Sequence, residues 1–372
     1  MSAATSSGVW LFGRETDLLV FGGSLLASML LLALGHAGGF LHGETPPWVW
    51  FAAVVLVDVA HVWSTCFRVY FDGAEVRRRP WLYLGVPVAA YVAGALLHAQ
   101  SPLAFWRALA YVALFHFVRQ QVGWVALYRR RAGEHGALDR RLDAAAIYAA
   151  TLYPVLYWHT HLPRRFSWFV EGDFVAGLPA VLEPAGFMLH AAIMTAWGGR
   201  QLQRLAAGAP VCWGKLLVVA STWVCWYGGI VLFDSDYAFT VTNVLIHGVP
   251  YFALTFRYGA GRFREDRGWR GQLFRSGWPV LYLAVAALAF GEEALWDRFI
   301  WREHEAFFGE WGAALEGAAA TLLVPLLALP QAVHYALDGF VWKGAGNPEL
   351  ARHLALPPAP EPAAPAALGM QS

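Results

Sequence analysis

The sequence predicts an all-α protein, a polytopic bundle of about ten transmembrane helices with both termini on the cytoplasmic side. Three observations support this fold class. Hydrophobic residues make up 58% of the 372-residue chain, charged residues make up only 14%, and the basic residues gather in a few short segments. A soluble domain of this size carries about 25% charged residues. The composition therefore indicates an integral membrane protein.

Apolar segments long enough to cross a bilayer, which takes roughly 20 residues, recur along the chain. We expect ten, with approximate bounds 18–34, 48–72, 81–97, 103–128, 142–158, 180–205, 211–233, 238–256, 279–296 and 311–342. Pro325 and Pro330 are expected to kink the last one, because proline lacks a backbone N–H and clashes with the preceding turn. We treat residues 1–355 as one membrane domain, and we expect the Pro/Ala-rich segment 356–372 to be disordered.

The basic clusters set the orientation of the predicted spans. These clusters lie at 77–79, 129–131, 200–204 and 257–275, and two predicted spans separate each from the next. All of them therefore fall on one side, which the positive-inside rule makes cytoplasmic. A net charge of only +1 gives no sign of a nucleic-acid partner. We expect an integral protein of the bacterial cytoplasmic membrane.

The second predicted span carries a stripe of polar residues along one helical face. These residues are Asp58, His61, Thr65, Arg68 and Asp72, at steps of three, four, three and four. Such steps return to the same face of a helix. A charged group at the centre of a membrane helix costs about 2.5–3.5 kcal/mol, so several on one face predict partners inside the bundle. We interpret the stripe as one wall of an internal polar site.

Other spans carry a histidine with a polar residue about one helical turn away. These groups are His116 with Gln120, His247 with Asn243 and Tyr251, and His334 with Gln331 and Asp338. His159 and His161 form a close pair at the outer end of the span 142–158. Either the chain after Pro154 folds back into the bundle, or this pair belongs to a different site.

These residue types predict a metal site inside the bundle. Neutral imidazole is the commonest protein ligand for iron, zinc and copper, and carboxylates complete such sites. Asp58 and His61 have the spacing by which helix-bundle di-metal proteins present a carboxylate and a histidine together, and His334 and Asp338 are one turn apart. The candidate ligands are His61, His116, His159, His161, His247, His334, Asp58 and Asp338. They suffice for one or two ions, most simply iron, with zinc as an alternative.

Further polar residues are expected to orient the ligands or to contact a substrate. Asp58, Gln120, Asn243 and Asp338 are placed to fix the tautomer of a ligating histidine. The candidate catalytic residues are Arg68, Arg119 and Tyr251. The two arginines are predicted to clamp an anion or carboxylate at the cytoplasmic mouth of the site, or alternatively to extend toward the inner head groups.

The collection of histidines resembles that of the histidine-rich integral membrane non-haem iron enzymes of the fatty-acid hydroxylase and desaturase type. The resemblance lies in chemistry, since their HxxxH and HxxHH boxes are absent and only HTH (His159 and His161) pairs two histidines closely. The segment HYALD, with His334 four residues before Asp338, is similar to a motif of the Brp/Blh-type carotene-cleaving dioxygenases. Both resemblances imply iron-dependent oxidation of a lipid.

Three functional hypotheses follow. The first is a membrane metalloenzyme that oxidises a lipid or isoprenoid entering from the bilayer, with an electron-transfer protein as a possible partner. The second is a haem b cytochrome, in which His61 and His116 would be axial ligands. The third is a proton-coupled transporter, because intramembrane histidines and acids also form proton relays.

Overall fold

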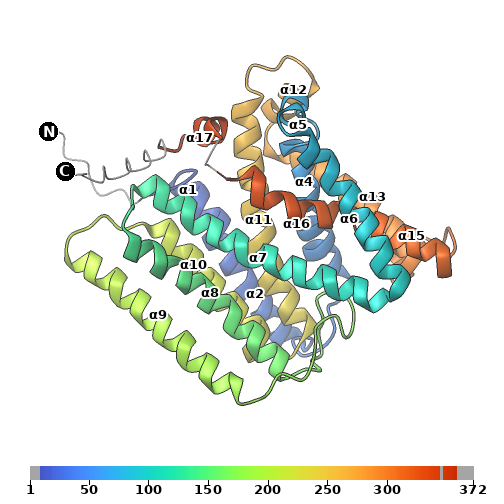
Figure 1. Cartoon of the computed structure of the whole chain (residues 1–372), viewed down its shortest axis with the longest axis horizontal. Coiled ribbons are helices and arrows are strands. Elements are labelled where there is room, and N and C mark those ends of the chain that lie inside the picture. Colours follow the sequence, from blue (N-terminus) through green and yellow to red (C-terminus); the bar gives the residue numbers. More distant parts are fainter. Residues whose placement is uncertain (1–8, 344–346, 358–372) are drawn as a thin grey trace, which may run out of the picture.

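The computed structural model describes residues 9–343 and 347–357, and within these ranges the protein is helical without any strand (Figure 1). The predicted all-α class is confirmed. Of the segment 356–372, for which we predict disorder, only Leu356 and Pro357 belong to the described residues. Leu356 is buried and packs against Leu350 and Leu354.

Long helices occupy all ten segments in which the sequence predicts a span. Their bounds, with the π-helical stretches (η) that continue some of them, are α1 (Arg14–Asp17), η1 (Leu18–Gly22) and α2 (Gly23–Gly38); α3 (Pro47–Val49), η2 (Trp50–Val59) and α4 (Ala60–Arg68); α6 (Pro80–Gln100); α7 (Pro102–Ala132); α8 (Ala137–Thr160); α9 (Leu182–Ala206); α10 (Trp213–Trp226) and η3 (Tyr227–Leu232); α11 (Asp236–Arg262); α13 (Trp278–Trp296) and η4 (Asp297–Trp301); and α15 (Gly317–Leu327) and α16 (Leu329–Val341). Short helices lie between or after them, namely α5 (Gly73–Arg78), α12 (Trp269–Arg275), α14 (Glu305–Phe308) and α17 (Pro348–His353).

Seven of the long helices, counted over the described part of the chain, are long and apolar enough to cross a membrane. They span residues 14–38, 47–68, 80–100, 213–232, 236–262, 278–301 and 317–341. The protein is therefore an integral membrane protein. Helices α7, α8 and α9 are comparably long but more polar, and they fall outside this set. The count of ten crossings and the cytoplasmic position of both termini remain predictions.

Local sequence signals fix the ends of two helices that matter for the site. Helix α7 begins at Pro102, and the hydroxyl of Ser101 accepts a hydrogen bond from the backbone N–H of Ala104 at 3.3 Å. It ends at Gly133, whose φ of 67° is the left-handed conformation that glycine adopts without strain. Helix α11 starts in the same way, since Ser235 accepts from the N–H of Ala238 at 3.1 Å.

The last predicted span, 311–342, differs from its expected form. Helix begins only at Gly317, and the segment is divided at Ala328 into α15 and α16. Pro330 stands in the first turn of α16, where its missing N–H costs no helical hydrogen bond. Only Ala328 separates the two helices; its backbone angles are those of a right-handed helix, and it donates its N–H to the carbonyl of Val324 at 3.0 Å. The segment 317–341 therefore continues as one candidate span, and the kink at the prolines stays a prediction.

Helix α11 occupies the centre of the bundle (Figure 1), where it packs against α2, α4, α10 and the π-helical segments η2 and η3. Helix α16 packs against α4, α6 and α7, so that α4, α7, α11 and α16 come together. Helix α9 lies at the edge of the bundle against α8. The four helices that meet at the centre are those that position the candidate site.

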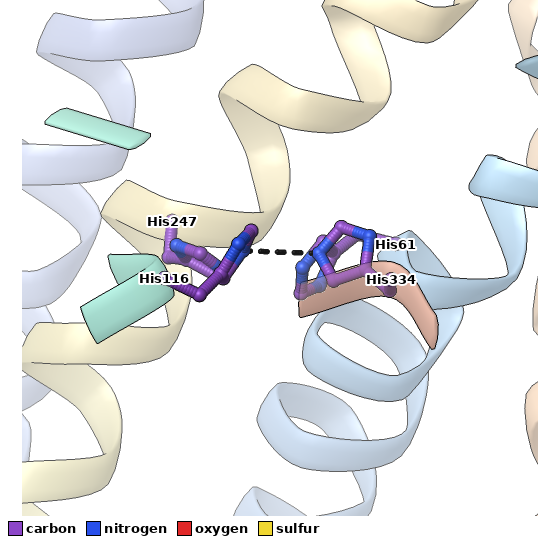
Figure 2. A group of neighbouring side chains, drawn as sticks. All are labelled: His61, His116, His247 and His334. Atoms are coloured by element: carbon purple, nitrogen blue, oxygen red, sulfur yellow. Dashed lines mark hydrogen bonds between the residues drawn. The ribbon is translucent and has the colours of Figure 1, made fainter. Parts of the chain in front are cut away.

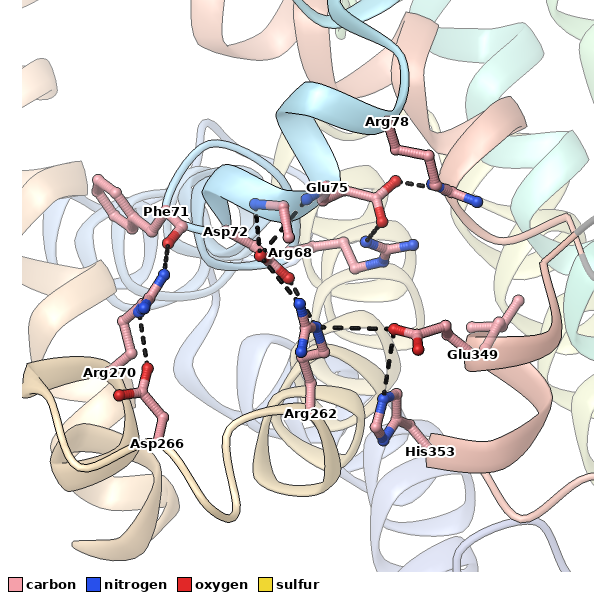
Figure 3. Close-up of polar contacts among 12 residues, drawn as sticks. Arg68, Phe71, Asp72, Glu75, Arg78, Arg262, Asp266, Arg270, Glu349 and His353 are labelled. Atoms are coloured by element: carbon pink, nitrogen blue, oxygen red, sulfur yellow. Dashed lines mark hydrogen bonds and ion pairs between the residues drawn. The ribbon is translucent and has the colours of Figure 1, made fainter.

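A network of charged residues closes one end of this four-helix group (Figure 3). The guanidinium of Arg68 is fully buried; it lies 3.3 Å from a carboxylate oxygen of Glu75 and donates to the carbonyl of Val341 at 2.9 Å. Burial alone would raise the pKa of Glu75, but Arg68, Tyr83 and Arg78 together hold it below its ordinary value. The pair joins α4 to α5 and to the end of α16.

Asp72 makes a second set of contacts in the same network. Its carboxylate caps α5 by accepting from the backbone N–H of Ala74 at 3.1 Å, and it also accepts from Nε of Arg262 at 2.8 Å. Glu349 of α17 lies on the outside of the network, 3.9 Å from Arg262. The connection after α4 is thereby fixed to the end of α11.

We expect the Glu75→Gln substitution to destabilise the folded protein by about 3–5 kcal/mol, because it leaves the buried guanidinium of Arg68 without its counter-charge. The matched control is Glu349→Gln, which removes an acid that is about half exposed and should change stability by less than about 0.5 kcal/mol. Unfolding of the purified proteins in the same detergent measures the difference. Equal effects of the two substitutions would contradict this role of the pair.

The effect should also depend on pH. Because the pKa of Glu75 is lower in the folded state, its stabilising contribution is present above the ordinary value of 4.5 and is lost as the pH falls through the folded pKa. The stability difference between the wild-type protein and Glu75→Gln should therefore shrink on acidification below that value.

Candidate metal centre

Four histidines from four helices meet at the centre of the bundle (Figure 2). They are His61 of α4, His116 of α7, His247 of α11 and His334 of α16, and none is more than 3% exposed. One ring nitrogen from each lies within 4.8 Å of the corresponding nitrogens of the other three. Residues on four different helices, separated by up to 273 positions in sequence, thus form one group.

The four rings surround a common centre. Neighbouring rings lie edge to face, with centroids 4.5–5.1 Å apart around the group. The Nε2 atoms of His116 and His334 are 3.1 Å apart. The ring of His247 also stacks on Phe117, with centroids 3.5 Å apart and an interplanar angle of 7°, which fixes its orientation.

A glycine allows two of the helices to approach closely at this level. A β-carbon at Gly248 would lie 2.9 Å from Cγ1 of Val57 and 3.3 Å from Nδ1 of His61. The first of these distances is shorter than side chains tolerate without a shift of their neighbours. Gly248 therefore allows α11 to bring His247 against the ring of His61.

Two carboxylates lie behind two of the histidines. An oxygen of Asp58 is 3.6 Å from Nδ1 of His61, and an oxygen of Asp338 is 3.6 Å from Nδ1 of His116. In metal sites, a carboxylate on the outer nitrogen of a histidine fixes the tautomer and orients the ring. For His116 the opposite nitrogen, Nε2, faces His334 within the group.

The pairing of Asp338 differs from the one that its sequence spacing suggested. Its position one turn after His334 predicts that it would serve that histidine, but it faces His116 on another helix. Nδ1 of His334 instead lies 2.7 Å from the hydroxyl of Thr65, which is 3.2 Å from the hydroxyl of Tyr251. We do not predict this role of Thr65 from the sequence, although Thr65 belongs to the polar stripe that also carries Asp58 and His61.

The ring nitrogens of two histidines have no hydrogen-bond partner among the described residues. Both nitrogens of His61 and both of His247 are buried in this state. A buried polar atom left without a partner costs about 1–3 kcal/mol, so the group is stabilised by any species that binds these nitrogens. Metal–imidazole bonds of about 2.0–2.1 Å place the nitrogens of a tetrahedral site about 3.4 Å apart. Here the four nitrogens lie within 4.8 Å of one another, and those of His116 and His334 are 3.1 Å apart. The donor set fits one ion of the zinc, copper or iron type.

His159 and His161 do not join this group, although both were candidate ligands. His159 hydrogen-bonds through Nε2 to the hydroxyl of Tyr111 at 2.8 Å and through Nδ1 to the carbonyl of Val155 at 2.7 Å. His161 is exposed and stacks on Tyr157. Helix α8 continues to Thr160, so the chain does not fold back after Pro154.

The predicted orienting and catalytic residues lie in different surroundings. Arg68 lies 3.3 Å from Glu75 and donates to the carbonyl of Val341, and its role as an anion clamp stays a prediction. Tyr251 is buried against the rings of His61 and His334. Gln120 and Asn243 are buried near the group but hydrogen-bond to none of the four histidines. Arg119 is exposed and donates to the hydroxyl of Tyr148 at 2.8 Å.

Two cavities of opposite charge approach the histidines. The first, which we call the acidic cavity, has a volume of about 760 Å³ and reaches Asp58 and Asn243. None of the described residues that line it is Lys or Arg, and its acids are Glu44, Asp58, Glu171, Asp236, Glu293, Asp297 and Glu303. Most of these lie on the side opposite the basic loops.

The second cavity, which we call the basic groove, has a volume of about 1060 Å³ and is lined directly by His116 and Asp338. Its basic residues are Arg119, Arg129, Arg130, Arg140 and Lys343. Tyr335 lines both cavities. The basic groove therefore reaches the histidine group directly at His116, and the acidic cavity reaches Asp58, whose carboxylate lies beside His61.

No protein-family model, no curated protein and no solved structure matches this chain. A functional assignment therefore depends on the residues and geometry described above, of which the four-histidine group is the most specific feature.

We expect the purified protein to bind one transition-metal ion per chain, and His61→Ala or His247→Ala to reduce this to a small fraction. Neither ring makes a hydrogen bond within the described residues, so these substitutions remove a ligand without breaking a hydrogen bond. Metal content after loading with Zn²⁺ and dialysis measures the effect. The matched control is His190→Ala, since His190 is also buried but hydrogen-bonds to the carbonyl of Ala149 at 2.7 Å.

The carboxylates supply a finer test of the same centre. Asp338→Asn should weaken metal binding by about 10–100-fold, because it removes the charge that orients His116.

Metal retention in the His61→Ala and His247→Ala variants at the wild-type level would contradict a metal centre at this position.

Proposed function

We propose that this protein is an integral membrane metalloenzyme that oxidises a lipid or isoprenoid. Its four-histidine group would bind one iron ion. The observation that carries this proposal is the convergence of four buried imidazoles on one point, with unpartnered nitrogens and a carboxylate behind two of the rings. Intramembrane ionisable groups are costly, so their concentration at one place favours a function.

The chemistry of the donors favours iron. The group contains no thiolate, and the closed structural sites of zinc are typically rich in cysteine. One nitrogen from each of the four histidines lies within 4.8 Å of the others, and this compact group favours a single ion over two. Bound iron would supply the activation of dioxygen, a use for which imidazole and carboxylate ligands with open coordination positions are typical. Zinc is the alternative for the same ligands.

The protein's own contribution is to hold the ligands and to exclude water. Phe117 and Thr65 hold two of the rings, and Asp58 and Asp338 orient the other two. The four rings are at most 3% exposed, and such burial limits side reactions of a strong oxidant with water. The same residues would keep the ligand set preorganised before a substrate arrives.

A membrane substrate is favoured by the basic groove. Its wall includes Val112, Phe115 and Phe340, which are 45%, 66% and 41% exposed, beside the buried His116. A lipid or isoprenoid can therefore approach from the bilayer without crossing water. An electron-transfer partner is part of the proposal for a hydroxylation or desaturation, whereas a cleavage that inserts both oxygen atoms needs none. We assign the protein to the bacterial cytoplasmic membrane.

The haem alternative receives little support from the geometry. A haem requires two axial histidines and a free plane between them for the porphyrin. Here four imidazoles surround the same centre, and the Nε2 atoms of His116 and His334 are only 3.1 Å apart.

A transporter of protons or cations is the second candidate, and one observation favours it. The acidic cavity and the basic groove approach the histidines from opposite sides, as an alternating-access site requires. The convergence of the rings on a single point favours the enzyme over this candidate, and the following experiment separates the two.

We expect the iron-loaded protein in lipid vesicles to consume dioxygen and to incorporate an isotope label from dioxygen into a lipid. The vesicles contain the lipid and isoprenoid extract of bacterial membranes, with and without an added reductant. Mass spectrometry of the lipids detects the label. His247→Ala should reduce incorporation to the level of the metal-free protein, and His190→Ala should retain it.

If the protein is fully loaded with iron and the vesicle lipids still contain no isotope label, this result would contradict the proposed enzymatic function. Flux of protons or of Zn²⁺ across the same vesicles, abolished by His247→Ala, would then favour the transporter.

A further inference from the structure

The basic groove combines a polar inner end with an apolar lateral wall. At the inner end His116, Gln120 and Asp338 line it, and the amide of Gln120 is 6% exposed with neither its oxygen nor its nitrogen hydrogen-bonded among the described residues. A buried amide in this state indicates a polar group of a ligand. The exposed side chains of Val112 and Phe115 continue the same face of α7 away from the basic loops.

The charges of the groove are unbalanced. Its two acids are engaged elsewhere, since Asp338 faces His116 and Glu134 pairs with Arg204 and Lys215. The cations Arg119, Arg140 and Lys343 form no ion pair within the described ranges 9–343 and 347–357. Arg119 donates only to a neutral hydroxyl, and Lys343 lies over the ring of Phe340 at 5.1 Å. We refer to these three residues as the groove cations.

The order of these features along α7 matches the order of groups in a lipid. Arg130 near the end of α7 and Arg140 in the first turn of α8 lie at one end of the groove. Arg119 and Gln120 lie about 15 Å further along α7 at 1.5 Å per residue, and Phe115 and Val112 follow. A lipid in the leaflet next to the basic loops has its head group at the interface and its chains toward the bilayer centre. Arg130 and Arg140 therefore lie at the head-group end, Arg119 and Gln120 lie at the level of the polar backbone of the lipid, and the apolar residues lie at the chain end.

We propose that the basic groove binds an acidic phospholipid from the leaflet that faces the basic loops. Arg140 and Lys343 hold its phosphate head group, Arg119 and Gln120 hydrogen-bond its polar backbone, and its chains lie along Val112 and Phe115. His116 then lies beside the bound lipid. That this lipid is also the substrate depends on the proposed function, whereas its binding does not.

Native mass spectrometry of the full-length protein, purified in a neutral detergent and titrated with phosphatidylglycerol or phosphatidylcholine, tests this proposal. We expect one phosphatidylglycerol to bind in clear preference to phosphatidylcholine. Arg119→Gln, Arg140→Gln and Lys343→Gln should each lower the affinity for phosphatidylglycerol by about fivefold. The matched control is Arg77→Gln, which removes an exposed arginine of another basic cluster and should leave the affinity unchanged.

A second pair of variants tests whether the lipid occupies the basic groove, and it leaves the groove cations unchanged. A β-carbon at Gly123 meets nothing within 4 Å, and Gly123 lines the groove beside Gln120, so Gly123→Leu should block the lipid while the cations remain. Gly198→Leu on α9 is its control, because Gly198 has the same free space outside the groove.

Equal binding of the two phospholipids by the wild-type protein, or undiminished binding by Gly123→Leu, would overturn the proposal. Metal content is measured on the same samples and should be unchanged in the groove variants. A failure of lipid binding is therefore distinguished from a failure of the metal centre.

Discussion

The rest of the structure depends on one constraint, which is that imidazole nitrogens inside a membrane bundle need partners. Four histidines share one buried centre, and two of them have no hydrogen bond within the described residues. Leaving such atoms unpaired is costly in a medium without water. A single metal ion would bind one nitrogen of each of the four rings at once, which a set of pairwise helix contacts cannot do.

Several features of the fold serve this constraint. Helix α16 packs against α4 and α7 and presents His334 to its partners, and Gly248 allows α11 to bring His247 against His61. The fully buried Arg68 and its partner Glu75 then join the end of α16 to α4 and α5. The chain thereby holds four separate helices at the distances that one coordination sphere requires, and two cavities of opposite charge lead toward it from the two sides.

The sequence predicts much of this arrangement, because the polar stripe of α4 and the isolated histidines of α7, α11 and α16 stand out against apolar surroundings. The long apolar segments likewise predict the helical class and the positions of the long helices. It could not predict which carboxylate faces which histidine, since Asp338 pairs across helices and not along its own. Nor could it exclude His159 and His161, because their separation from the group follows from how α8 packs, which spacing alone does not determine.

X-ray absorption spectroscopy of the zinc-loaded protein tests the central claim most directly, because it reports the ligands of the ion without requiring a substrate. We predict a shell dominated by four imidazole nitrogens at about 2.0–2.1 Å, without sulfur. A shell with fewer than three imidazoles, or one made mainly of sulfur or of water oxygens, would contradict a four-histidine coordination sphere.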